Sequence, residues 1–189
     1  MEQASERKFD RNEVLKKCFD CLVSNGLENT SIRSFSVASG LNSSSLYYWF
    51  HNKDEIVLEA TLYGLKTIID DLFAQAYGYL NDLDTLFTHF PRVIAAYTDH
   101  LRLVYQVLVS PQYGAQLKAA TAELSSAYDS YGKVLADRLN CNYDTLCPFV
   151  RLFISVATNY VLWGDEAEAI KQYKELHQGI NIMILSKQN

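Results

Sequence analysis

The sequence predicts an all-α protein of about nine helices. Apolar residues make up 49% of the 189 residues, and there are only 3 Pro and 8 Gly. This composition fits a packed helical protein and excludes the disordered and fibrous classes. Apolar side chains recur every three or four positions along most of the chain, which is the period of an amphipathic helix. No segment shows the strict alternation of a half-buried strand, and the chain contains no internal repeat.

The first three helices are expected at residues 9–25, 32–39 and 43–49. Thr30 or Ser31 is suited to cap the second helix, and Asn42 or Ser43 the third, because short polar side chains accept hydrogen bonds from the free amides of a first turn. Gly40, between the two short helices, allows the positive φ of a sharp turn. Two short helices joined in this way behind a supporting helix are typical of a helix-turn-helix.

The rest of the chain is expected to be helical as well. Asn52 and Glu55 have the spacing of a capping box at the start of a long helix. Pro91 suits the first turn of a helix, and Ser110–Pro111 breaks the chain before the next one. Since no flexible linker follows the long helix, the two parts of the chain should be rigidly coupled. The expected helices are residues 53–77, 81–90, 91–109, 110–139, 144–163 and 166–185.

The charge distribution limits how the chain could bind nucleic acid. The net charge is −5 overall; residues 1–56 hold seven Lys and Arg against eight Asp and Glu, a net charge of −1. A broad positive field is therefore absent. Binding of DNA would have to rest on individually placed phosphate contacts.

Enzyme, metal and membrane functions find no support in the sequence. The four histidines lack metal-ligand spacing, and no nucleotide-binding or nucleophile motif is present. Cys18 and Cys21 form a C-x-x-C without a second ligand pair, so they are interpreted as small buried thiols. No run approaches the ~18 apolar residues of a membrane helix, and the N-terminus lacks a signal-peptide core. We expect a cytoplasmic protein with no enzymatic activity, no cofactor, no metal and no membrane partner.

The third helix carries the groups that point to DNA. Leu46 and Phe50, four residues apart, are expected to face the core. The other faces then present short hydroxyls, which let a helix enter the ~12 Å major groove, and aromatic donors for phosphate oxygens. Lys53 adds a positive charge just beyond the helix. The alternative is an ordinary helical corner with exposed aromatic side chains.

The stretch S-I-R-x-F-S-x-x-S-G-L-N-x-S-S-L-Y-Y-W-F-x-N-K-x-E resembles the N-terminal signature of tetracycline-repressor-type (TetR family) transcriptional regulators. The match covers residues 9–60; beyond it, the likeness lies in helix count and the final helix pair. The resemblance implies a helix-turn-helix DNA-binding domain at residues 1–56 and a helical effector-binding and dimerisation domain at residues 57–189. Ser36 and Ser39 replace alanines of the family pattern, and Ser44 replaces its glycine.

The resemblance also implies roles by position. Base or groove contacts fall on Ser44, Ser45 and Tyr48, and phosphate contacts on Thr30, Tyr47, Trp49 and Lys53; Arg33 and Ser43 complete the predicted DNA-binding set.

A candidate effector pocket lies in the second part of the chain, where eleven of the thirteen tyrosines occur. An apolar cavity with a few polar tips is the usual form of a small-molecule site. Any one of these side chains could equally be core with a satisfied hydroxyl. The candidates, on helices that surround a cavity in the TetR family, are Tyr97, His100, Tyr105, Tyr113, Tyr128, Phe153, Asn159 and Trp163.

The last two predicted helices carry more apolar surface than one packed face requires, so they could pair with the same two helices of a second subunit. Burial of both faces within one subunit is the alternative. The candidate dimer-interface residues are Leu146, Phe149, Phe153, Val156, Tyr160, Ile170, Tyr173, Leu176, Ile180 and Met183.

Together these observations predict a homodimeric regulator that binds double-stranded DNA. A small apolar or amphipathic effector would release it from a near-palindromic operator, so that it acts as a repressor. The main alternative is an all-α ligand-binding or adaptor protein that no longer binds DNA. A helical enzyme would require a polar constellation that the sequence does not contain.

Overall fold

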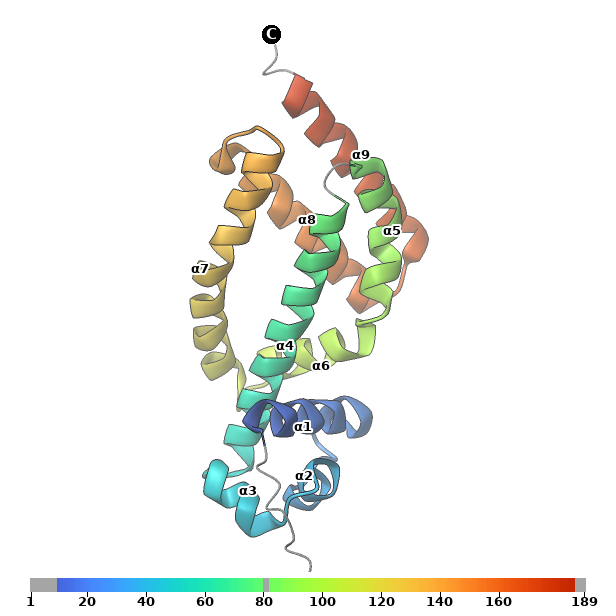
Figure 1. Ribbon diagram of the computed structural model, residues 1–189. Helices are drawn as coiled ribbons and strands as arrows, with labels where there is room; N and C mark the ends of the chain where they lie inside the picture. The colour runs from blue at the N-terminus through green and yellow to red at the C-terminus, as the bar shows by residue number, and fades with distance from the viewer. Residues whose placement is uncertain (1–9, 80–81, 186–189) are drawn as a thin grey trace, which may run out of the picture. The chain divides into compact units, whose positions relative to one another are not determined.

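The computed structural model describes residues 10–79 and 82–185, and over this range the chain is helical with no strand. The side chains of residues 123, 125–128, 184 and 185 lie outside the description. Figure 1 shows the order of the helices. They are α1 (Arg11–Asn25), α2 (Ile32–Ser39), α3 (Ser43–Trp49), α4 (Lys53–Gly78), α5 (Leu83–Ala95), α6 (Thr98–Val109), α7 (Gly114–Arg138), α8 (Tyr143–Trp163) and α9 (Glu166–Leu185).

The chain packs as two compact units. The first comprises Met1–Lys66 and Leu103–Ala119, and the second comprises Thr67–Arg102 and Ala120–Asn189. The predicted boundary at residue 56 divides the chain by role and stays a prediction. By packing, the first unit continues into α4 and also takes in the corner between α6 and α7.

The first unit is built on the apolar face of α1. Val14, Cys18 and Leu22 are 0–1% exposed on this face, because they are spaced four residues apart and so lie on one side of the helix. α2 packs on α1, and α3 on α2. Phe35 of α2 and Leu46 of α3 are both fully buried. In Figure 1, α2 and α3 lie on the same side of α1. The predicted helix-turn-helix is therefore present; of the first predicted helix, Phe9 lies outside the described residues.

The turn between α2 and α3 is held by the serines that depart from the family pattern. Gly40 has φ of +74° in the left-handed region, as the sequence predicts. The Ser39 hydroxyl is buried; it donates to Phe35 O at 2.7 Å and accepts from Leu41 N at 3.3 Å. The Ser36 hydroxyl donates to Leu41 O at 2.5 Å. Both hydroxyls thus satisfy polar groups at the turn.

The second unit contains a packed group of three helices, α5, α8 and α9. Their contact is an aromatic cluster in which the Phe90 and Phe153 rings lie 4.3 Å apart and the Phe153 and Tyr173 rings 4.9 Å apart. The Phe87 ring lies 5.5 Å from Phe153, edge on. Aromatic pairs at these distances and angles are favourable beyond the area they bury.

Two predicted helix starts are wrong. Pro91 lies inside α5 and is buried there, rather than at the start of the next helix. The break comes at residues 96–97, where Tyr97 N donates to Ile94 O at 2.9 Å and α6 starts after this tighter turn. Proline inside a helix removes one backbone hydrogen bond, and burial of its ring in the α5 core offsets part of that cost. The last long helix before the final pair begins at Gly114, beyond Ser110–Pro111.

Candidate nucleic-acid interface

α3 presents hydroxyl and aromatic groups to solvent from a firmly held backbone. Leu46 and Phe50 are fully buried, as predicted, and fix the helix on the unit. Ser43 and Ser44 are exposed, and Ser45 is half-buried. Tyr48 is 87% exposed and Tyr47 51% exposed. Large aromatic side chains at such exposure on a seven-residue helix form an apolar patch with polar tips, the kind of surface that a partner usually covers.

Caps at both helices of the motif set the direction of α3. Ser31 caps α2, and the Ser31 and Ser34 side chains bond back to each other's backbone in a capping box. Asn42 caps α3 by accepting from Ser45 N at 2.8 Å. Of the paired alternatives that the sequence offers, the structure selects Ser31 and Asn42. Each cap satisfies an amide that would otherwise have no partner, a contribution of about 1 kcal/mol.

Two cations of the predicted set are available to phosphates. Arg33 on α2 is exposed and Lys53 at the start of α4 is half-buried. Neither forms an ion pair with any residue that the structure describes. By contrast, Lys17 bonds Glu13 at 2.7 Å within α1. A cation that is not held in an ion pair can approach a phosphate without first breaking one.

Thr30 is placed differently from its predicted role. The residue is 1% exposed, and its hydroxyl donates to Gly26 O at 2.7 Å. A buried hydroxyl that already donates to the chain cannot donate to a phosphate in this conformation. Thr30 instead stabilises the turn between α1 and α2, and we leave it out of the proposed interface.

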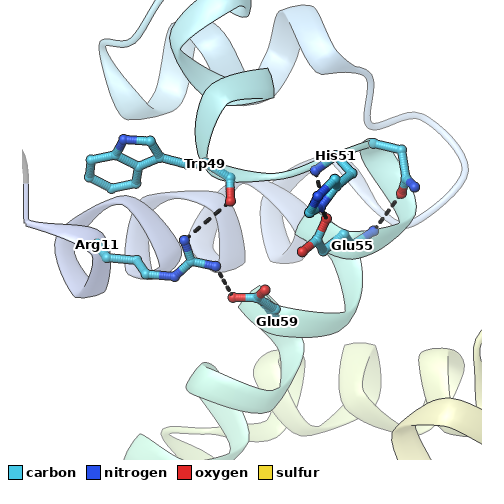
Figure 2. A network of polar contacts seen from close by, with 6 residues as sticks. Arg11, Trp49, His51, Glu55 and Glu59 are labelled. Carbon is cyan, nitrogen blue, oxygen red and sulfur yellow. Dashed lines mark hydrogen bonds and ion pairs between the residues drawn. The ribbon is translucent and has the colours of Figure 1, made fainter.

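Arg11 ties the end of α3 to α1 and α4, a role that the sequence does not reveal. Figure 2 shows its guanidinium between Trp49 and Glu59. It donates to Trp49 O at 3.2 Å and to Glu59 Oε2 at 2.6 Å, and its carbon lies 4.6 Å from the centre of the Phe50 ring. The side chain of Trp49 itself is half-buried. Arg11 was missed because its partners lie 38 and 48 residues away, beyond the reach of any local pattern.

The turn between α3 and α4 is closed by a variant of the predicted capping box. Asn52 Oδ1 accepts from Glu55 N at 2.9 Å, as predicted. The Glu55 carboxylate bonds the backbone N–H of His51 at 2.6 Å rather than that of Asn52, and it also bonds His51 Nδ1 at 2.8 Å. These hydrogen bonds, the one from the backbone first, lower the pKa of Glu55 below its usual value.

Burial favours the protonated form of the two thiols of α1. Burial raises the pKa of Cys18 to about 12, with a smaller contribution from Cys21. Burial raises the pKa of Cys21 as well, partly opposed by a hydrogen bond from Asn25. A thiol that stays protonated is neither a nucleophile nor a metal ligand. Among the described residues no group of His, Cys, Asp and Glu side chains could hold a metal ion.

The predicted effector residues are divided between the two units. Tyr97 and His100 are half-buried on neighbouring turns, with ring centres 6.4 Å apart, and the Tyr97 hydroxyl donates to Asp71. Phe153 belongs to the aromatic cluster of the second unit. Tyr113 is 5% exposed in the first unit and donates to Asp54 at 2.8 Å.

The remaining effector candidates also come from both units. Tyr105 is half-buried in the first unit, and the Tyr128 side chain lies outside the described residues. Asn159 is exposed and Trp163 is 80% exposed. Two surface grooves stand out, one of about 620 Å³ between α1 and α2 and one of about 250 Å³ at residues 136–142; neither is lined by a predicted effector residue.

The stripe predicted to meet a second subunit is instead turned inward for much of its length. Leu146, Val156, Tyr173, Leu176 and Ile180 are each less than 10% exposed within the single chain. Four other apolar residues of α8 are about half exposed or more: Leu152 and Ile154 at 54%, Leu162 at 48% and Trp163 at 80%. Spacings of three and four residues drift by only about 20° per heptad, so the stripe stays on one side of α8, and packing against α5 and α9 covers that side within the chain. Of the predicted interface residues, Phe149, Phe153, Tyr160, Ile170 and Met183 are half-buried.

Comparison with known proteins supports the fold. No family model and no curated protein matches the chain. A solved structure from Mesorhizobium loti MAFF303099, of a protein assigned to the TetR family of transcriptional regulators, is 14% identical, with a TM-score of 0.71 over 93% of this chain and 98% of that one. A second, of a protein from Pseudomonas aeruginosa PAO1 assigned as a transcriptional regulator, is 13% identical, with a TM-score of 0.53 over 89% of this chain and 88% of that one. The chain therefore has the all-α fold of a protein assigned to the TetR family, as the sequence predicts.

Proposed function

We propose that this protein is a DNA-binding transcriptional regulator whose α3 helix enters the major groove. The observation that carries the proposal is the surface of α3, where Tyr47, Tyr48, Ser43 and Ser44 are exposed while Leu46 and Phe50 anchor the helix. Aromatic and hydroxyl donors on a short helix suit base edges and phosphate oxygens. The solved structure with the similar fold, assigned to a family of transcriptional regulators, supports the same function.

The charge distribution indicates which side chains would contact the DNA backbone. With a net charge of −1 over residues 1–56, general attraction to DNA is weak. Arg33 and Lys53, which have no ion pair with a described residue, are the proposed phosphate contacts, and Tyr48 is the proposed base reader. A single copy with so few cations would bind DNA weakly, which favours binding of two copies to a near-palindromic site.

The exposed apolar face of α8 is the proposed dimer interface. By length and composition α8 is the one described helix that could cross a membrane, and only 17% of its most apolar window is buried in the chain. A helix with these properties is covered either by lipid or by another protein surface. The proposed binding of two copies to a near-palindromic site favours a second copy, which would bury Leu152, Leu162 and Trp163 around a two-fold axis.

Sedimentation of a variant with Leu152→Asp and Leu162→Asp tests this interface. The variant should be monomeric, and it should lose affinity for a two-half-site operator while binding a single half-site as the natural chain does. Lys171→Asp, at an exposed position of α9, is the matched control for an added carboxylate and should leave the dimer intact. A dimer that survives both aspartates would contradict the α8 assignment.

We further propose that a small apolar or amphipathic effector binds within residues 57–189 and releases the operator, so that the protein acts as a repressor in the cytoplasm. Tyr97 and His100 are the remaining paired candidates. Their half-buried rings lie beside the hydrogen bond from Tyr97 to Asp71, which gives an apolar surface with a polar tip. Native mass spectrometry of the purified protein would detect a co-purifying molecule, and Tyr97→Phe should weaken its retention.

Binding to the DNA that flanks its own gene tests the central proposal. Fluorescence anisotropy should give a dissociation constant at least 10³-fold lower for one flanking fragment than for a shuffled fragment of equal length. Equal, weak binding to both fragments would favour the alternative, an all-α ligand-binding or adaptor protein, for which the acidic balance of residues 1–56 is the main argument.

A further inference from the structure

His51 lies in the turn between α3 and α4, three residues after Tyr48 and two before Lys53. Its side chain is 90% exposed, yet one edge of the ring is fixed. Nδ1 lies 2.8 Å from Glu55 Oε2, and the His51 backbone N–H donates to the same oxygen at 2.6 Å. Figure 2 shows the ring held against the carboxylate. The opposite edge, which carries Nε2, has no hydrogen bond to any residue that the structure describes.

The carboxylate determines which ring nitrogen carries the proton. Hydrogen bonds from His51 lower the pKa of Glu55, so its carboxylate is ionised at neutral pH and can only accept. Nδ1 must therefore be the donor. In the neutral ring Nε2 then has a lone pair and no proton, and in the imidazolium it becomes a second N–H donor.

A phosphate oxygen distinguishes between these two forms. It repels the lone pair of the neutral ring and accepts a charge-assisted hydrogen bond from the imidazolium. The same turn already holds Lys53, whose charge is not paired with any described carboxylate. Of the other charged groups around the turn, Arg11 of α1 is paired with Glu59 of α4, and the Asp54 carboxylate of α4 accepts hydrogen bonds from two neutral donors, Gln112 and Tyr113. α3 itself contributes no charged side chain.

We propose that His51 is a proton-dependent DNA contact, in which Nε2–H donates to a backbone phosphate only when the ring is an imidazolium. This inference rests on the proposed DNA-binding function and adds to it a residue that the sequence resemblance does not place in the interface. Operator binding then takes up as much as one proton per subunit, and affinity rises as the pH falls.

Measurement of operator affinity against pH tests the proposal. Anisotropy at pH 5.5, 6.5, 7.5 and 8.5, at constant ionic strength, should show binding about three- to tenfold tighter at the lowest pH than at the highest for a single exposed charge-assisted contact per subunit. The dependence of log K on log salt should also be steeper at pH 5.5 by about 0.9 per subunit.

Two variants separate His51 from the other three histidines, which lie at residues 89, 100 and 177. His51→Gln, which cannot take up a proton, should bind like the natural chain at pH 8.5 and lose both the pH dependence and the added salt slope. His51→Lys, charged throughout, should bind at pH 8.5 as tightly as the natural chain at pH 5.5. Thermal unfolding of both variants confirms that they are folded.

The outcomes distinguish the inference from the function on which it rests. If the natural chain binds no DNA fragment specifically at any pH, the proposed function fails. If it binds an operator and His51→Gln retains the full pH dependence, only the role of His51 is overturned.

Discussion

Replacement of Arg11 by methionine should lower the unfolding free energy of the first unit by about 1–2 kcal/mol. Three contacts contribute. The ion pair to Glu59 is short, at 2.6 Å, but the two side chains are 45% and 34% exposed, so it is worth about 0.2–1 kcal/mol. The hydrogen bond to Trp49 O and the position over the Phe50 ring add about 0.5–1 kcal/mol each at such exposure. These contributions share one side chain and are not fully additive, hence the estimate.

Denaturant unfolding followed by tryptophan fluorescence measures this change in the first unit. The chain has two tryptophans, so a Trp163→Phe background leaves Trp49 as the reporter of the first unit. Lys17→Met is the matched control, because it removes another α1 cation whose one ion pair with a described residue, to Glu13, is local and exposed. It should cost less than about 0.5 kcal/mol.

A double-mutant cycle with Glu59→Gln isolates the ion pair and should give a coupling of about 0.2–1 kcal/mol. Arg11→Met should also weaken operator binding, since the end of α3 loses its connection to α1 and α4. If Arg11→Met lowers the unfolding free energy no more than Lys17→Met does, the three contacts do not stabilise the position of α3 and the reasoning is refuted.

Three further predictions concern the same surface. Lys53→Ala should weaken binding to all DNA sequences alike and reduce the salt slope by about one unit; an unchanged slope would remove Lys53 from the phosphate contacts. Tyr48→Ala should alter sequence preference in a selection from randomised DNA, whereas a uniform loss of affinity would exclude a base-reading role. The lowered pKa of Glu55 stabilises the folded state above its ordinary value of 4.5, and this contribution disappears as the pH falls through the lowered pKa. Glu55→Gln should therefore show a smaller loss of unfolding free energy between pH 6 and pH 3 than the natural chain, and equal losses would contradict the assignment.

Helix boundaries in the first unit could be predicted because their signals are local. Caps and a glycine act within one turn, so residues 32–39 and 43–49 are helical as predicted, with the left-handed turn at Gly40. The position of Pro91 could not be predicted in the same way. A proline suits a first turn, yet Pro91 lies inside α5 and is buried there, and burial depends on packing beyond its own turn.

In the candidate interface, too, some properties follow from local sequence and others depend on the fold. Exposure of Tyr48 and burial of Leu46 and Phe50 follow from helical periodicity alone. Burial of Thr30 does not, because a threonine next to a predicted cap is equally suited to face solvent. Its hydroxyl donates a hydrogen bond to Gly26 O, and this interaction depends on how the α1–α2 turn closes.

Periodicity, caps and composition determine that this chain is all-α, that it contains a helix-turn-helix, and which side chains of α3 face outward. These properties depend on neighbours within about one helical turn. Tertiary structure alone decides that Arg11 joins α3 to α4, that Tyr113 bonds Asp54, and which apolar face of α8 is covered. The apolar stripes of α8 are similar in sequence, and only packing against α5 and α9 selects the one that is buried. Contacts between residues tens of positions apart are set by the whole fold, so no local pattern encodes them.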